Sequence, residues 1–190
     1  MCSKIFSIGI LVFLLACRTT TSYQGAVIHN TDNKYGNLQD DALFLVNLKS
    51  DAQFIEQMSV LTLDKQMAYS KKVYDLAEEL KKDYSDFQFK LNVLALKKNV
   101  KLPDQTRPEY KEAYQMAFDT DDAVKYDQFF IENVTSVNDS LLMRLNRYTE
   151  EGSDDAILKF IKNQTGTVER TYNQLEMIKK ELIDKESETK

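Results

Sequence analysis

The chain has no tryptophan, one histidine, two prolines, five glycines and two cysteines in 190 residues. Both cysteines, Cys2 and Cys17, fall within the first seventeen residues. Beyond that point the sequence therefore excludes disulfides, thiolate metal ligands and a cysteine nucleophile. The scarcity of glycine and proline favours long helices, and no run of alternating apolar residues competes with them as a strand pattern.

The first seventeen residues resemble a bacterial lipoprotein signal. Lys4 precedes an apolar run from Ile5 to Leu15, which has the length of a signal-peptide core and is shorter than the roughly 20 residues that span a bilayer. The run ends in Ala16-Cys17, and polar residues follow at once. In such a lipobox the Cys17 thiol is lipidated and the cysteine becomes the mature N-terminus. The alternatives are an ordinary secretory signal or an uncleaved anchor, and the small Ala16 favours the lipobox.

The resemblance to lipoproteins implies a location. Several acyl chains on Cys17, palmitate among them, would hold the protein firmly at a membrane, since each buried CH₂ contributes about 0.8 kcal/mol. In the sorting rule of enteric bacteria an Asp after the cysteine retains a lipoprotein at the inner membrane, and this chain has Arg18 there. We therefore expect an outer-membrane lipoprotein that faces the periplasm.

The charge balance disfavours two classes of partner. The chain carries 25 Lys and Arg against 30 Asp and Glu, and loss of the signal removes one lysine, which takes the net charge from −5 to −6. Such a surface has no excess of cations to neutralise phosphates, so nucleic acid and anionic lipid surfaces are disfavoured as partners.

Composition divides the chain into four parts. We expect a signal peptide over residues 1–16, a lipidated cysteine with a flexible polar tether over 17–39, a helical domain over 40–185 and a frayed tail over 186–190. The tether is rich in Thr, Ser, Asn, Asp and Gly and has no sustained periodicity, so it would let the domain stand off the membrane.

Four apolar stripes predict four helices, and the second stripe has steps of three and four residues throughout. They are Phe44, Leu48, Phe54, Ile55, Met58 and Leu61; Val73, Leu76, Leu80, Tyr84, Phe87, Leu91 and Leu94; Tyr126, Phe130, Val134, Val137, Leu141, Leu145 and Tyr148; and Ile157, Phe160, Ile161, Val168, Tyr172, Leu175, Ile178 and Leu182. In the first helix Asn47, Ser50 and Asp51 interrupt the pattern.

Capping residues set the expected helix ends. Ser70 is the N-cap candidate of the second helix, Asp119, Asp121 and Asp122 are those of the third, and Ser153 is that of the fourth. Gly152 is expected in the left-handed conformation that ends a helix. The prolines of Leu102–Pro108 break the chain, and residues 109–118 are expected to form a short helix across an end of the bundle. Short connections elsewhere predict an all-α, up-down four-helix bundle.

Three segments resemble a bacterial family of secreted, ferritin-like bundles of unknown function, domain of unknown function 4142. Their order and spacing agree with the family pattern over most of the chain after the signal. The segments are residues 73–77 leading to Asp83-Tyr84, residues 94–103, and Tyr126-Asp127-Gln128-Phe129-Phe130.

The resemblance implies a ferritin-like fold but not a metal site. The family pattern has a histidine in each of the second, third and fourth helices, and this chain has Tyr84, Asn138 and Thr171 at those positions. No cofactor is therefore implied. Where the family often has a proline in the last helix, this chain has Gly166.

Few other residues suggest chemistry. His29 lies in the expected tether, away from the helices. The run Asp119-Thr120-Asp121-Asp122 resembles the start of a calcium loop, but Ala123 and Val124 fall where a ligand and a glycine belong, so helix capping explains the aspartates better. The sequence predicts no catalytic residues.

Three functional hypotheses remain open. The first is a non-enzymatic lipoprotein that serves a binding or structural role with an unidentified envelope protein. The second is a degenerate ferritin-like metalloprotein that binds iron or manganese through carboxylates, with Glu56 and Glu132 as ligands. The third is a self-associating bundle or a helix-groove binder, either of which would leave one apolar face exposed; the sequence does not fix the oligomeric state.

Overall fold

A computed structural model describes residues 20–65 and 70–188, with side chains as far as Ile183 apart from that of Lys65. All elements in these residues are helices, which confirms the all-α prediction. They are α1 (Tyr23–Asn33), α2 (Asn37–Lys65), α3 (Lys71–Lys97), α4 (Pro108–Asp119), α5 (Ala123–Glu151) and α6 (Asp155–Glu188). Cys17 and the expected signal peptide lie outside the described residues.

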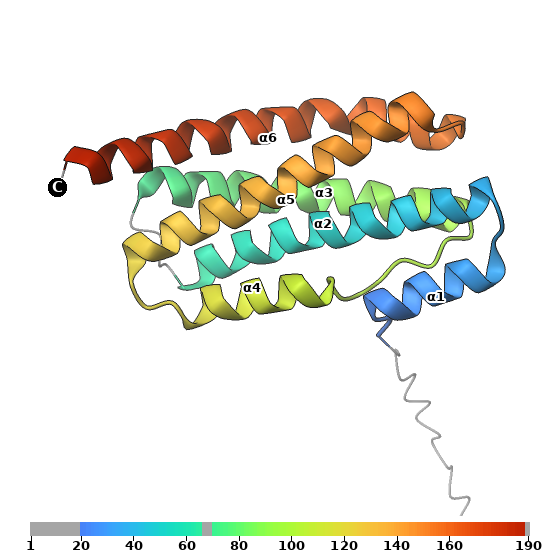
Figure 1. Ribbon diagram of the computed structural model, residues 1–190, viewed down its shortest axis with the longest axis horizontal. Coiled ribbons are helices and arrows are strands. Elements are labelled where there is room, and N and C mark those ends of the chain that lie inside the picture. Colours follow the sequence, from blue (N-terminus) through green and yellow to red (C-terminus); the bar gives the residue numbers. More distant parts are fainter. Residues whose placement is uncertain (1–19, 66–69, 189–190) are drawn as a thin grey trace, which may run out of the picture.

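The four long helices form the bundle, and α1 and α4 lie along one side of it (Figure 1). The contacting pairs are α2 with α3, α5 with α6, α2 with α5, and α3 with α6. Figure 1 shows that the partners in each pair run in opposite directions, whereas α3 and α5 run the same way. The expectation that helices joined by short connections are antiparallel is confirmed for α2 with α3 and for α5 with α6, but the consecutive long helices α3 and α5 are parallel, so the chain does not alternate up and down throughout.

The connection between α3 and α5 is long, because it returns the chain along the length of the bundle. Pro108 begins α4, where its missing N–H costs no hydrogen bond. The helix packs along α2 and α5 rather than across an end of the bundle, so that part of the prediction is wrong. The two prolines and the residues between them supply the extended path that the return requires.

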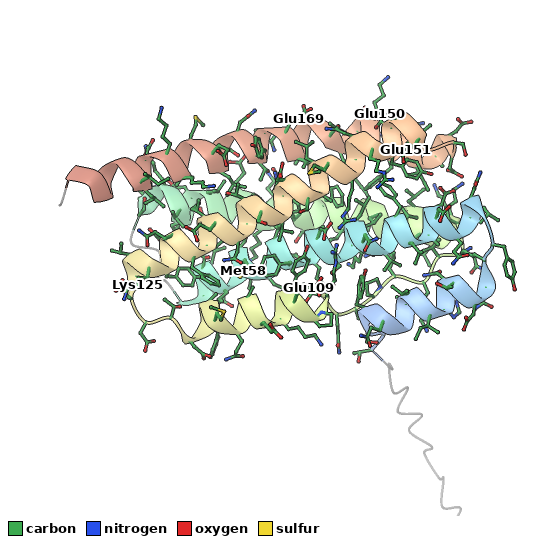
Figure 2. The ribbon with its side chains drawn as sticks, in the orientation of Figure 1. Met58, Glu109, Lys125, Glu150, Glu151 and Glu169 are labelled. Atoms are coloured by element: carbon green, nitrogen blue, oxygen red, sulfur yellow. The ribbon has the colours of Figure 1, made fainter. Side chains whose placement is uncertain are left out.

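The predicted stripes form the core. Every residue of the α3 stripe and of the α5 stripe is buried, and Phe54, Ile55, Met58 and Leu61 of α2 are buried against them. Figure 2 shows Met58 inside the bundle and Glu169 on the outer side of α6. The helix prediction from periodicity is confirmed for these elements.

Residues 23–33 form a helix, so the prediction of a flexible tether over 17–39 is wrong there. Ser22 caps α1 by accepting the Gly25 N–H at 3.0 Å. Of the residues in α1, Ala26 and Asn30 are buried. So narrow a buried face leaves no apolar stripe in the sequence, and polar contacts hold the helix instead.

Helix ends differ from the prediction at three places. The Ser70 side chain makes no capping bond, and its N–H instead donates to Asp127 Oδ2 of α5 at 2.7 Å. Asp154, rather than Ser153, caps α6 by accepting the N–H groups of Ala156 and Ile157. Asp122 caps α5, as one of the predicted candidates. At the other end α6 continues through the expected tail as far as Glu188.

Gly152 is not left-handed, since its φ is −77°. It is nevertheless constrained, because a Cβ at this position would clash with the Tyr148 ring. Among non-glycine residues the left-handed conformation occurs at Asn99, just after α3, with φ of 51°. There Val100 N–H reaches back to Ala95 O at 2.9 Å, which closes the helix end.

Candidate functional site

Tyr84, Asn138 and Thr171, the positions at which the family resemblance predicts histidines, meet in the interior of the bundle. They come from α3, α5 and α6, and each is at most 1% exposed. The Tyr84 hydroxyl donates to Asn138 Oδ1, and the Thr171 side chain forms a further hydrogen bond with Tyr84. Asn138 Nδ2 donates to the Val168 carbonyl of α6 at 3.1 Å. One polar cluster therefore joins three of the four long helices.

Burial keeps this cluster neutral. Removal from water raises the pKa of Tyr84 well above its ordinary value, and the hydrogen bond with Thr171 opposes that rise only in part. A neutral tyrosine acts as a donor, and Asn138 offers an amide oxygen that Tyr84 already occupies. The arrangement stabilises the core; it offers neither an ionised nucleophile nor a base.

A second buried group surrounds Asp51 of α2, whose side chain has no exposed surface. Asp51 Oδ1 pairs with Arg107 and accepts the Tyr110 hydroxyl at 2.7 Å, while Oδ2 accepts Arg144 Nε at 3.1 Å. Burial raises the pKa of Asp51, and the two guanidinium groups and Tyr110 act in the opposite direction. The network ties α2 to α4, to α5 and to the residue that precedes α4.

Arg107 also connects this network to α1. Its guanidinium lies 5.1 Å from the centre of the Tyr110 ring and 5.7 Å from that of Tyr23, which are cation–π distances. The Tyr23 hydroxyl donates to Asn47 Oδ1 at 2.7 Å, and Arg107 N–H donates to Ser50 Oγ at 3.0 Å. The polar residues that interrupt the α2 pattern thus face the elements that lie along the side of the bundle.

The candidate carboxylate ligands do not form a metal site. The Glu56 carboxylate of α2 accepts hydrogen bonds from Ser85 and Gln88 of α3, and Glu132 is exposed on α5. His29 is exposed on α1. Within residues 20–65 and 70–188, no group of three or more His, Cys, Asp and Glu side chains could hold a metal ion.

An open groove of about 510 Å³ lies beside the start of α2 and the end of α5. Its lining includes Asp41, Arg144, Arg147, Tyr148 and Glu151. The Tyr148 hydroxyl donates to Asp41 Oδ1 at 2.5 Å, and Arg147 Nε pairs with Glu151 at 2.9 Å. The groove mixes both signs of charge, which suits contact with a polar protein surface better than capture of an anion.

Residues 30–178 match the family model described as "Domain of unknown function (DUF4142)". The chain belongs to this family. The match spans α2 to α5 and most of α6 and begins inside α1, so DUF4142 here comprises the bundle with its long connection. No curated protein and no solved structure matches the chain significantly.

Among the helices of residues 20–65 and 70–188, none is long and apolar enough to cross a membrane.

Proposed function

We propose that this DUF4142 protein is a membrane-anchored bacterial lipoprotein whose bundle serves a binding or structural role at the outer membrane, facing the periplasm, and performs no catalysis. The anchoring rests on the sequence that ends in Ala16-Cys17. The non-catalytic role rests on one observation, the closed cluster of Tyr84, Asn138 and Thr171, whose polar groups bond to one another out of reach of a substrate.

The connectivity supports a ferritin-like ancestry. A bundle with one long crossover connection is the ferritin-like arrangement, and here the connection between α3 and α5 provides that crossover. We infer that Tyr84, Asn138 and Thr171 occupy the positions of the family histidines. Their convergence on one point supports this assignment, because residues that replace a ligand set should still face a common centre. The site has exchanged metal ligation for hydrogen bonds.

The lipoprotein assignment is tested by cell fractionation of the full chain in a bacterial host. The Cys17→Ser variant lacks the thiol that accepts lipid and should move from the membrane pellet to the soluble fraction. The Cys2→Ser variant is the matched control, because it removes the other cysteine and should stay with the membranes. If Cys17→Ser remains in the pellet to the same extent as the unaltered chain although its mass shows that the signal has been removed, the anchor is not a lipid at Cys17.

A further inference from the structure

The outer side of α3 carries an apolar patch near the end of that helix. Phe89, Val93 and Leu96 are spaced by four and three residues, which places them on one side of a helix. Phe89 is 67% exposed, Val93 38% and Leu96 80%, while Leu91 on the opposite side is buried in the core. Of the helices in residues 20–65 and 70–183, α3 is the one with three exposed large apolar side chains. We call Phe89, Val93 and Leu96 the α3 patch.

The α3 patch points away from the rest of the bundle. On one flank of α3, Ser85 and Gln88 bond to Glu56 and Lys49 of α2. On the other flank, Glu79 and Asp83 bond to Arg170 of α6. The α3 patch lies between these two flanks, on the side opposite the core.

We propose that the α3 patch binds the α3 patch of a second copy of this chain, with the two helices antiparallel about a two-fold axis near Val93. A two-fold axis sets one surface against itself, so Phe89 of each copy packs against Leu96 of the other. The exposed part of Phe89 amounts to roughly 100–170 Å². A stable interface buries about 800 Å² on each partner, so a contact centred on three side chains makes a transient dimer.

Charges further along α3 select the antiparallel arrangement. Towards the start of the helix the same side carries only charged or polar residues, among them Lys71, Asp75, Glu78 and Lys82. In a parallel pair each of these charges would face its own copy, and like charges set against one another repel. The antiparallel pair brings the two apolar ends together and separates the charged ends.

The charges beside the α3 patch also match in this arrangement. Asp86 and Lys97 lie on the flank towards α6, at opposite ends of the patch, so an antiparallel copy sets Lys97 of one chain near Asp86 of the other. Asp86 pairs with Lys90 through Oδ2 at 2.5 Å and is 55% exposed, which leaves room at Oδ1 for a second cation. Lys98 is on the side of the core and pairs with Asp154.

This dimer keeps both chain starts on one side. The contacting pairs place the long helices in a ring in the order α2, α3, α6, α5, so α2 and α6 lie at opposite corners. The two-fold axis is perpendicular both to α3 and to the direction in which the patch points, and it therefore runs along the line from α2 to α6. Because α1 packs against α2, the α1 helices of both copies lie on the same side. Two chains anchored in one membrane need this geometry, although the contact itself does not depend on the anchor.

A single introduced cysteine tests the contact, because residues 18–190 contain none. Val93→Cys places the thiol near the proposed axis. Asp75→Cys is the matched control, since 18 residues make five helical turns and put position 75 on the same side of α3. In the antiparallel dimer the two copies of position 75 are about 50 Å apart. The unaltered chain controls for reaction at Cys17, and a monofunctional maleimide checks that both introduced thiols react.

Each full chain is treated in bacterial cells with a short bismaleimide, and the products are identified by mass. Val93→Cys should give at least about ten times as much linked dimer as Asp75→Cys, because only the thiols at position 93 lie close together. No linked dimer at position 93, or equal amounts at both positions, overturns the proposal. A product that joins position 93 to a different protein assigns the patch to another partner and also overturns it.

A charge in the patch provides the second measurement. Added to Val93→Cys, the exposed substitution Leu96→Glu should remove most of the linked dimer, while Met143→Glu should not, because Met143 is 65% exposed on α5 at the corner opposite α3. Circular dichroism checks that both variants remain folded. If Leu96→Glu leaves the linked dimer unchanged, the α3 patch is not the contact. Fractionation of Cys17→Ser reports on the anchor separately, so the failure of one proposal is distinguishable from the failure of the other.

Discussion

Replacement of Tyr84 by phenylalanine isolates the hydroxyl that joins the central polar cluster. The change keeps the ring, which packs in the core, and leaves Asn138 Oδ1 without its hydrogen-bond donor in a fully buried place. A buried polar group that loses its partner costs about 1–3 kcal/mol. For a chain of this size, a loss of 2 kcal/mol should lower the melting temperature by roughly 4 to 8 °C.

Tyr126→Phe is the matched control. Tyr126 is equally buried, and its hydroxyl bonds to Thr62 Oγ1 at 2.9 Å. Thr62 also bonds to the Met58 carbonyl at 2.9 Å, so it keeps a partner when the tyrosine hydroxyl is removed. We expect this variant to lose less than about 1 kcal/mol.

Urea unfolding of residues 18–190, followed by circular dichroism, measures both variants. The reasoning predicts that Tyr84→Phe lowers the free energy of unfolding by at least about 1 kcal/mol more than Tyr126→Phe does. Equal losses would refute it, because the cluster would then contribute no more than an ordinary buried hydroxyl.

Three further predictions use the same assay or a metal measurement. Gly152→Ala should destabilise the fold, because the added Cβ would clash with the Tyr148 ring. Gly166→Ala should stabilise α6 by about 0.5–1 kcal/mol, because no atom lies within 4 Å of the added Cβ. If the two variants changed the free energy of unfolding in the same way, the contact between Gly152 and Tyr148 would not be the constraint on that glycine. Burial opposes ionisation of Asp154, but Lys98 and the capped N–H groups outweigh it and lower its pKa. The ionised Asp154 carboxylate therefore stabilises the fold above about pH 4, and this stabilisation disappears as the pH falls through the lowered pKa. The Asp154→Asn variant should have a lower free energy of unfolding than the unaltered chain at pH 7, and the two values should converge in acid. Anaerobic loading with ferrous iron or manganese should leave no stoichiometric metal after desalting, and one metal per chain would restore the metalloprotein hypothesis.

Periodicity predicted the long helices because each of α3, α5 and α6 buries a single stripe. The periodic pattern is weakest in α2, since α1, α3, α4 and α5 all contact this helix. A helix covered on several sides needs no single polar face, and its polar positions, such as Ser50 and Asp51, bond to Arg107. The sequence presents these residues as interruptions, while in the structure they are the points of attachment.

The remaining errors share a cause, which is that tertiary contacts replace local signals. Asn30 fixes α1 through bonds to Lys101, 71 positions away, which no local pattern reveals. Gly152 is required by the ring of Tyr148 and not by its own backbone angles. The convergence of Tyr84, Asn138 and Thr171 could be anticipated only as a family correspondence, because the spacing of residues on separate helices carries no information about their contact.

The mass of the protein purified from membranes tests the central proposal most directly. The account predicts a chain that begins at Cys17 and carries the added mass of several fatty acyl chains, all of it lost from the Cys17→Ser variant. A membrane-bound protein that begins at another residue, or one that begins at Cys17 without added lipid, would contradict the proposal that a lipid at this cysteine anchors the bundle.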